Sequence, residues 1–165
     1  MAIGAQNLTI TITEDFGTNQ TWISGGTTGT NLSTSIAEVV AVNDIYARII
    51  SVTHTAEHTL YTTNDNWAYI SGQQFDDENV TYARITNHDA DSPGNFITLR
   101  LKNANDDEFS YKLGAGKSFI LWGHLASMDA TAGAAITLGS GDNDIVAVSA
   151  KADTASVDVE IVVCS

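Results

Sequence analysis

Cysteine and proline are almost missing from this chain of 165 residues, which has one of each. The lone Cys164 cannot form an internal disulfide, so a stable fold must depend on packing. Its place one residue before the C-terminus indicates a small apolar residue that ends the last strand. No apolar run approaches the roughly 20 residues of a membrane span, and no basic segment opens the chain. We therefore expect neither a membrane helix nor a signal peptide.

Cationic side chains are also scarce, because 7 Lys and Arg face 20 Asp and Glu and give a net charge of −13. Proteins bind nucleic acids largely by placing Lys and Arg on phosphates, and a surface this acidic repels them. The same repulsion acts at an anionic membrane surface. We expect no nucleic-acid partner and no membrane partner.

Apolar residues are abundant at 43%, and their dominant period along the chain is two. In the segment NLTITIT, the apolar side chains of Leu8, Ile10 and Ile12 alternate with threonines, which is typical of a half-buried strand. Turn residues separate the runs. The expected strands are 7–13, 45–52, 58–62, 80–86, 96–102, 109–113, 118–122, 135–138, 145–149 and 157–163. The pattern predicts one all-β domain over 1–165, an antiparallel β-sandwich with jelly-roll wiring.

Residues 17–35, GTNQTWISGGTTGTNLSTS, differ from the rest in being small, polar and rich in glycine and threonine. The segment is either a long loop or an arm that orders against a neighbouring subunit. In the second case Trp22 is the anchor, and the expected interface residues are Trp22, Ile23, Asn31 and Leu32. The next segment, 36–42, reads equally as a helical turn or a strand.

The segment GAGKS at 114–118 resembles the end of a phosphate-binding loop. That motif needs a glycine at position 111, where this chain has Tyr111, and a helix directly afterwards. The residues that follow are Phe119, Ile120, Leu121 and Trp122, which form a strand pattern. The sequence therefore predicts a hairpin in which 109–113 and 118–122 are joined by a glycine turn and Lys117 is exposed.

Other polar groups offer no complete site for chemistry. His54 and His58 have the spacing of a zinc pair, but no third ligand is specified. The clusters at 103–108 and 142–144 hold oxygen ligands suited to calcium, without the spacing of a known calcium loop. We read the histidines as surface residues and the acidic clusters as turns. We expect no metal, no cofactor and no catalytic residue.

The aromatic residues leave one alternative open. Side chains on one face could stack on sugars, although those within strands are equally suited to the core. The residues concerned are Trp22, Tyr61, Trp67, Tyr69 and Trp122.

The run from Val80 to Trp122 resembles a module of small virion proteins of tailed bacteriophages. The shared pieces are RITN at 84–87, ITLRLKN at 97–103 and LGAGKSF at 113–119, and the segments at 129–133 and 153–163 are also similar. The resemblance implies a jelly-roll virion component, of which capsid decoration (cement) proteins fit best by size and acidity. Such proteins often form trimers, and the resemblance carries no catalytic residue.

We therefore expect a structural protein of the capsid surface, made in the host cytoplasm and not an enzyme. Its expected partners are the major capsid protein and further copies of itself, with a trimer favoured. The alternative is a tail, head-fibre or receptor-binding module that recognises surface glycans through its aromatic residues.

Overall fold

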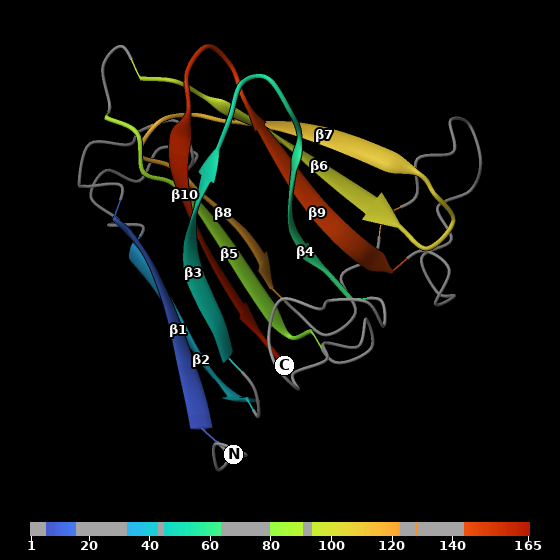
Figure 1. Ribbon diagram of the computed structural model, residues 1–165. Helices are drawn as coiled ribbons and strands as arrows, with labels where there is room; N and C mark the ends of the chain where they lie inside the picture. Colours follow the sequence, from blue (N-terminus) through green and yellow to red (C-terminus); the bar gives the residue numbers. More distant parts are fainter. Residues whose placement is uncertain are drawn as a thin grey trace, which may run out of the picture. The chain divides into compact units, whose positions relative to one another are not determined.

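The computed structural model describes residues 6–15, 33–42, 45–63, 80–90, 94–122, 128 and 144–165 (Figure 1). Every regular element within these residues is a β-strand, which confirms the all-β class predicted from the period of two. The chain divides into two compact units, Met1–Asn43 and Asp44–Ser165, which are described separately. The single domain expected from the chain length stays a prediction.

The first unit contains one antiparallel pair of strands, β1 (Gln6–Asp15) and β2 (Ser33–Val42). The alternation expected for β1 is present only in part, because Ile10 is buried between the exposed Thr9 and Thr11, whereas Ile12 is 39% exposed. The segment that reads as a helical turn or a strand is part of β2, so it is a strand.

The second unit consists of two antiparallel four-stranded sheets with the strand orders β3-β10-β5-β8 and β4-β9-β6-β7. Strands that are distant in the sequence pair within each sheet, as β10 does with β3 and β5. The strands are β3 (Ile45–Val52), β4 (His58–Thr62), β5 (Tyr82–Asn87), β6 (Ile97–Asn103), β7 (Glu108–Leu113), β8 (Ser118–Trp122), β9 (Ile145–Ala152) and β10 (Val157–Cys164). The segment 135–138, expected to be a strand, lies outside the described residues.

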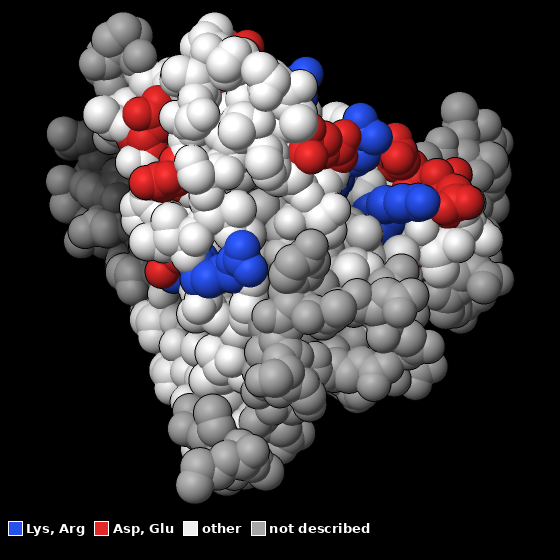
Figure 2. Space-filling view, viewed as in Figure 1, with Lys and Arg blue, Asp and Glu red and all other residues white. Residues whose placement is uncertain are grey.

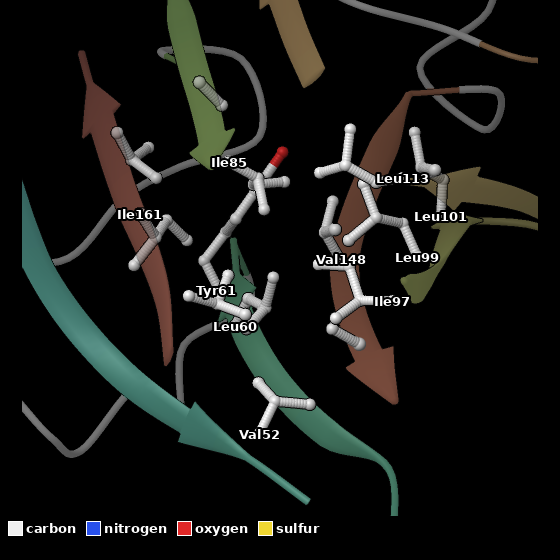
Figure 3. Close-up of a cluster of buried hydrophobic side chains, with 14 of the residues drawn as sticks. Val52, Leu60, Tyr61, Ile85, Ile97, Leu99, Leu101, Leu113, Val148 and Ile161 are labelled. Carbon is white, nitrogen blue, oxygen red and sulfur yellow. The ribbon is translucent and has the colours of Figure 1, made fainter. Parts of the chain in front are cut away.

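The two sheets share one hydrophobic core, an arrangement like that of a β-sandwich (Figure 3). On β6 the side chains of Ile97, Leu99 and Leu101 are buried, while those between them point away from the core. The same alternation on β10 buries Val159 and Ile161 from the other sheet. Each such side chain contributes about 1.5–3 kcal/mol by leaving water, so this core is the main source of stability.

Cys164 is the last residue of β10 and is 1% exposed. This burial confirms its interpretation as a small apolar residue at the end of the last strand. Burial also raises the pKa of its thiol, because the thiolate loses its hydration in apolar surroundings.

The hairpin predicted around the glycine turn is wrong, because β7 and β8 belong to different sheets. β7 pairs with β6, and β8 pairs with β5. The reason lies in the connection, where the amide of Gly116 donates to the carbonyl of Asn87 and the amide of Asn87 donates to the carbonyl of Lys117, each at 3.0 Å. These bonds tie the start of β8 to the end of β5. Residues 114–117 therefore form a corner between the sheets.

Within the described part of the chain, no helix is long and apolar enough to cross a membrane.

Candidate functional site

The expected interface residues Trp22, Ile23, Asn31 and Leu32 lie outside the described residues, as do Trp67 and Tyr69. The backbone of Trp122 ends β8, and its side chain is not described. Tyr61 is 2% exposed in the core, so its ring is not available to stack on a sugar. Of the aromatic residues proposed for sugar binding, Tyr61 is therefore excluded.

The GAGKS segment is a packed corner of the fold. Gly116 has a φ of 67°, a left-handed conformation that glycine adopts without strain. Lys117 donates its amide to the carbonyl of Gly114 at 3.2 Å, which closes the turn. A β-carbon at Gly94 would overlap with the carbonyl oxygen of Ala90 and the β-carbon of Ala115. The backbone at Gly94 therefore lies directly against the corner. A strand, β8, follows the turn in place of the helix that a phosphate-binding loop requires.

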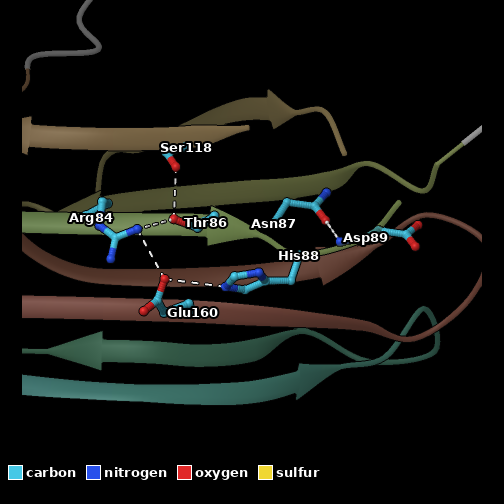
Figure 4. Close-up of polar contacts among 7 residues, drawn as sticks. All are labelled: Arg84, Thr86, Asn87, His88, Asp89, Ser118 and Glu160. Atoms are coloured by element: carbon cyan, nitrogen blue, oxygen red, sulfur yellow. Dashed lines mark hydrogen bonds and ion pairs between the residues drawn. The ribbon is translucent and has the colours of Figure 1, made fainter. Parts of the chain in front are cut away.

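Asn87 joins the corner to the rest of the fold and is fully buried. Its side-chain amide donates to the carbonyl of Asn95 at 2.9 Å and to that of Leu113 at 3.3 Å. Its side-chain oxygen accepts from the amide of Asp89 at 2.9 Å (Figure 4). Asn87 therefore joins the segment at Asn95, the end of β7 at Leu113 and the turn at Asp89. No local sequence motif predicts this structural role.

Asn103 has the same role in the first of the two clusters considered for calcium. It is fully buried, and its amide donates to the carboxylate of Asp107 and to the carbonyl of Met128, each at 3.1 Å. Its oxygen accepts from the amide of Asp107 at 2.8 Å. Of the second cluster the structure describes only Asp144, whose carbonyl accepts a hydrogen bond from the amide of Ala104 at 3.2 Å. The contacts described here are internal hydrogen bonds, as expected of a turn.

The histidine pair predicted as a surface feature is not a metal centre in the described residues. The ring Nε2 of His58 lies 2.9 Å from the hydroxyl of Thr53, and His54 is exposed in the loop before β4. Nowhere among the described side chains do three or more His, Cys, Asp or Glu lie close enough together to hold a metal ion.

The outer face of the β3-β10-β5-β8 sheet carries a polar network centred on Glu160 (Figure 4). Its carboxylate lies 3.1 Å from the guanidinium of Arg84 and 3.4 Å from the ring of His88. Arg84 also donates to the hydroxyl of Thr86 at 2.8 Å, and this hydroxyl lies 2.9 Å from that of Ser118. Each member has a partner on a neighbouring strand, so the network joins β10, β5 and β8 through side chains.

The outer face of the β4-β9-β6-β7 sheet carries a second network, centred on Arg100. Its guanidinium lies 3.1 Å from Glu57 and 3.4 Å from Glu108, and Glu57 also accepts a hydrogen bond from Ser149. Lys102 lies 2.5 Å from Asp106, and this carboxylate raises the pKa of the lysine. In Figure 2, blue and red atoms lie next to each other over this part of the molecule.

Both networks consist of ion pairs and hydroxyls at half-buried or exposed positions of the sheet surface. Such groups stabilise a face weakly and can exchange partners with an incoming surface. No protein-family model, no curated protein and no solved structure matches this chain.

Proposed function

We propose that the chain is a phage virion structural protein with jelly-roll wiring, a capsid decoration (cement) protein that is not an enzyme. The strand order is the observation that carries the proposal. If the strands β3 to β10 are counted as one to eight, the sheets read 1-8-3-6 and 2-7-4-5. This order is typical of the jelly roll, a fold found in capsid proteins, lectins and cupins. Because this fold hosts several functions, the fold alone does not indicate one of them. The resemblance of 80–122 to virion proteins favours a structural role in the virion.

The proposed activity is reinforcement of the head by protein–protein contacts with the major capsid protein and with other copies, a trimer being favoured. Contacts that are individually weak become strong when symmetry repeats them and several must break together. The net charge of −13 suits a component that stays outside the packaged nucleic acid. The function needs no cofactor.

The test is the number of copies per purified virion, measured by quantitative mass spectrometry against the major capsid protein. We expect hundreds of copies, as for a protein that tiles the shell. A handful of copies would place the chain in the tail or at a vertex. Complete absence from the virion would refute the proposal.

A second candidate, a tail, head-fibre or receptor-binding module, is favoured by two aromatic side chains on β7. Phe109 is 52% exposed and Tyr111 is 42% exposed. Their rings offer apolar surface to a sugar, and lectins include jelly rolls. A glycan array tests this function with the wild type, Phe109→Ala and Tyr111→Ala. Specific binding that both variants lose would support it.

A further inference from the structure

The cations of this acidic chain are concentrated on one surface. Four of its seven Lys and Arg lie on the outer side of the β4-β9-β6-β7 sheet, which we call the cationic face: Arg100, Lys102, Lys112 and Lys151. Among the described residues, the carboxylates that form ion pairs with these cations are Glu57, Asp106 and Glu108. The exposed Asp153 follows β9 directly, where its amide donates to the carbonyl of Phe96, and it forms an ion pair with none of the four.

Sheet register explains how residues from three strands share this face. Thr98 pairs with Lys112 on one side and with Lys151 on the other. Arg100 pairs with Ser110 and Ser149 in the next row. Paired residues in a sheet point to the same side, and the neighbours of these residues along β6 and β9 point into the core. The four cations therefore point away from the core together.

Among the described residues, Lys112 and Lys151 are the two cations of the cationic face that form no ion pair with a carboxylate. Both are exposed, and no ion pair joins either to a described residue. The ammonium of Lys112 lies 3.8 Å from the ring centroid of Phe96, which holds it in place without neutralising it. The two lysines are separated by two strand spacings, about 10 Å. Their row presents two positive charges flanking a hydroxyl.

We propose that the cationic face is the surface by which one copy of this chain contacts the acidic surface of a second copy. This inference rests on the self-association included in the proposed function. A neighbouring copy supplies the required chemistry, because its chain carries 20 Asp and Glu against 7 Lys and Arg. Lysine ammonium groups and the hydroxyls of Thr98 and Ser110 donate to its carboxylates.

The contact is heterologous, because one copy uses its cationic face and the next uses a different, acidic surface. Heterologous contacts close into rings when the rotation permits, as a trimer requires. Repulsion between the two net negative copies is screened beyond about 8 Å at physiological ionic strength, whereas charges in contact are screened much less. Local attraction can therefore exceed the long-range repulsion.

Sedimentation equilibrium of the purified full chain tests the proposal. We expect the wild type to associate at about 0.1 M NaCl and to dissociate at about 1 M NaCl, where charges are screened within about 3 Å. Lys112→Glu/Lys151→Glu should raise the dissociation constant at least about tenfold. Lys112→Gln/Lys151→Gln should raise it less, since it removes attraction without adding repulsion.

The matched control is Arg48→Glu/Lys117→Glu, which changes two cations outside the cationic face. Both glutamate variants shift the net charge from −13 to −13 − 4 = −17. The control should stay within about threefold of the wild type at the same salt concentration. Circular dichroism of every variant verifies that the strands are intact.

Three results would overturn the inference. One is a wild-type chain that is monomeric at both salt concentrations. Another is an equal loss of association in the two glutamate variants, which would attribute the effect to net charge. The third is unchanged association in Lys112→Glu/Lys151→Glu. None of these results affects the copy number in virions, so a failure here is distinct from a failure of the proposed function.

Discussion

At the scale of single residues, two buried asparagines fix the positions of loops in this fold through hydrogen bonds. Asn87 and Asn103 are both fully buried, and each makes several hydrogen bonds to the backbone of adjoining turns. A buried polar group that loses its partner costs about 1–3 kcal/mol, whereas a satisfied one stabilises modestly. The loops that these residues hold therefore depend on them.

Asn87→Ala should lower the free energy of unfolding by about 2–4 kcal/mol, because it leaves the carbonyls of Asn95 and Leu113 and the amide of Asp89 without their partner. Urea denaturation followed by circular dichroism measures this change. Asn105→Ala, at an exposed turn position, is the control and should stay within about 0.5 kcal/mol. Equal stability of the two variants would contradict the role given to Asn87.

At the scale of elements, the corner between β7 and β8 decides which sheet each strand joins. The backbone hydrogen bonds of Asn87 place β8 beside β5. The backbone at Gly94 packs directly against Ala115. β7 remains an edge strand of the other sheet, and the ring of Tyr111 lies 5.1 Å from that of Phe119 across the corner. Because the corner is tightly packed, an added β-carbon should be tolerated differently at Gly94 and at Gly114.

Gly94→Ala should destabilise the protein by about 1–3 kcal/mol, because its methyl group has no space beside Ala90 and Ala115. Gly114→Ala is the matched control, since a β-carbon there meets only the side chain of Lys117 at an ordinary 3.7 Å. Thermal unfolding of both variants measures the difference. A Gly94→Ala variant as stable as Gly114→Ala would show that the loop and corner are not packed as described.

At the scale of the whole molecule, three ionisable groups lie in surroundings that favour their neutral forms. Burial raises the pKa of the Cys164 thiol above its ordinary 9.0 and the pKa values of the Tyr61 and Tyr82 hydroxyls above 10.0. The folded chain therefore keeps protons that the unfolded chain loses in alkali. The stability from these groups is complete below pH 9 and is lost as the pH rises.

The free energy of unfolding should accordingly fall above pH 9, by up to about 1.4 kcal/mol per pH unit for each group that titrates only in the unfolded chain. Urea denaturation at a series of pH values measures the slope. Cys164→Ala should reduce the slope first, near pH 9, and Tyr61→Phe should reduce it above pH 10. A flat profile up to pH 11 would refute this account.

Local patterns in the sequence were enough to predict the all-β class, most strand positions and the identity of GAGKS as a turn without a following helix. These properties are local, because alternation along a strand and the residues of a turn are readable within a few positions. The burial of Cys164 also followed from a local pattern. By contrast, the sequence predicted a hairpin between β7 and β8 that does not exist.

The pairing of strands, the roles of Asn87 and Asn103 and the position of the cationic face follow from long-range contacts in the folded chain. Arg84 and Glu160 meet because β5 and β10, which are distant in the chain, become neighbours in a sheet. Lys112 and Lys151 come to lie on either side of Thr98 for the same reason. The alternation of apolar residues with a period of two predicts which side of the sheet each side chain faces. It does not predict which strands pair with one another. That choice depends on the packing of the whole core and on the hydrogen bonds at its corners.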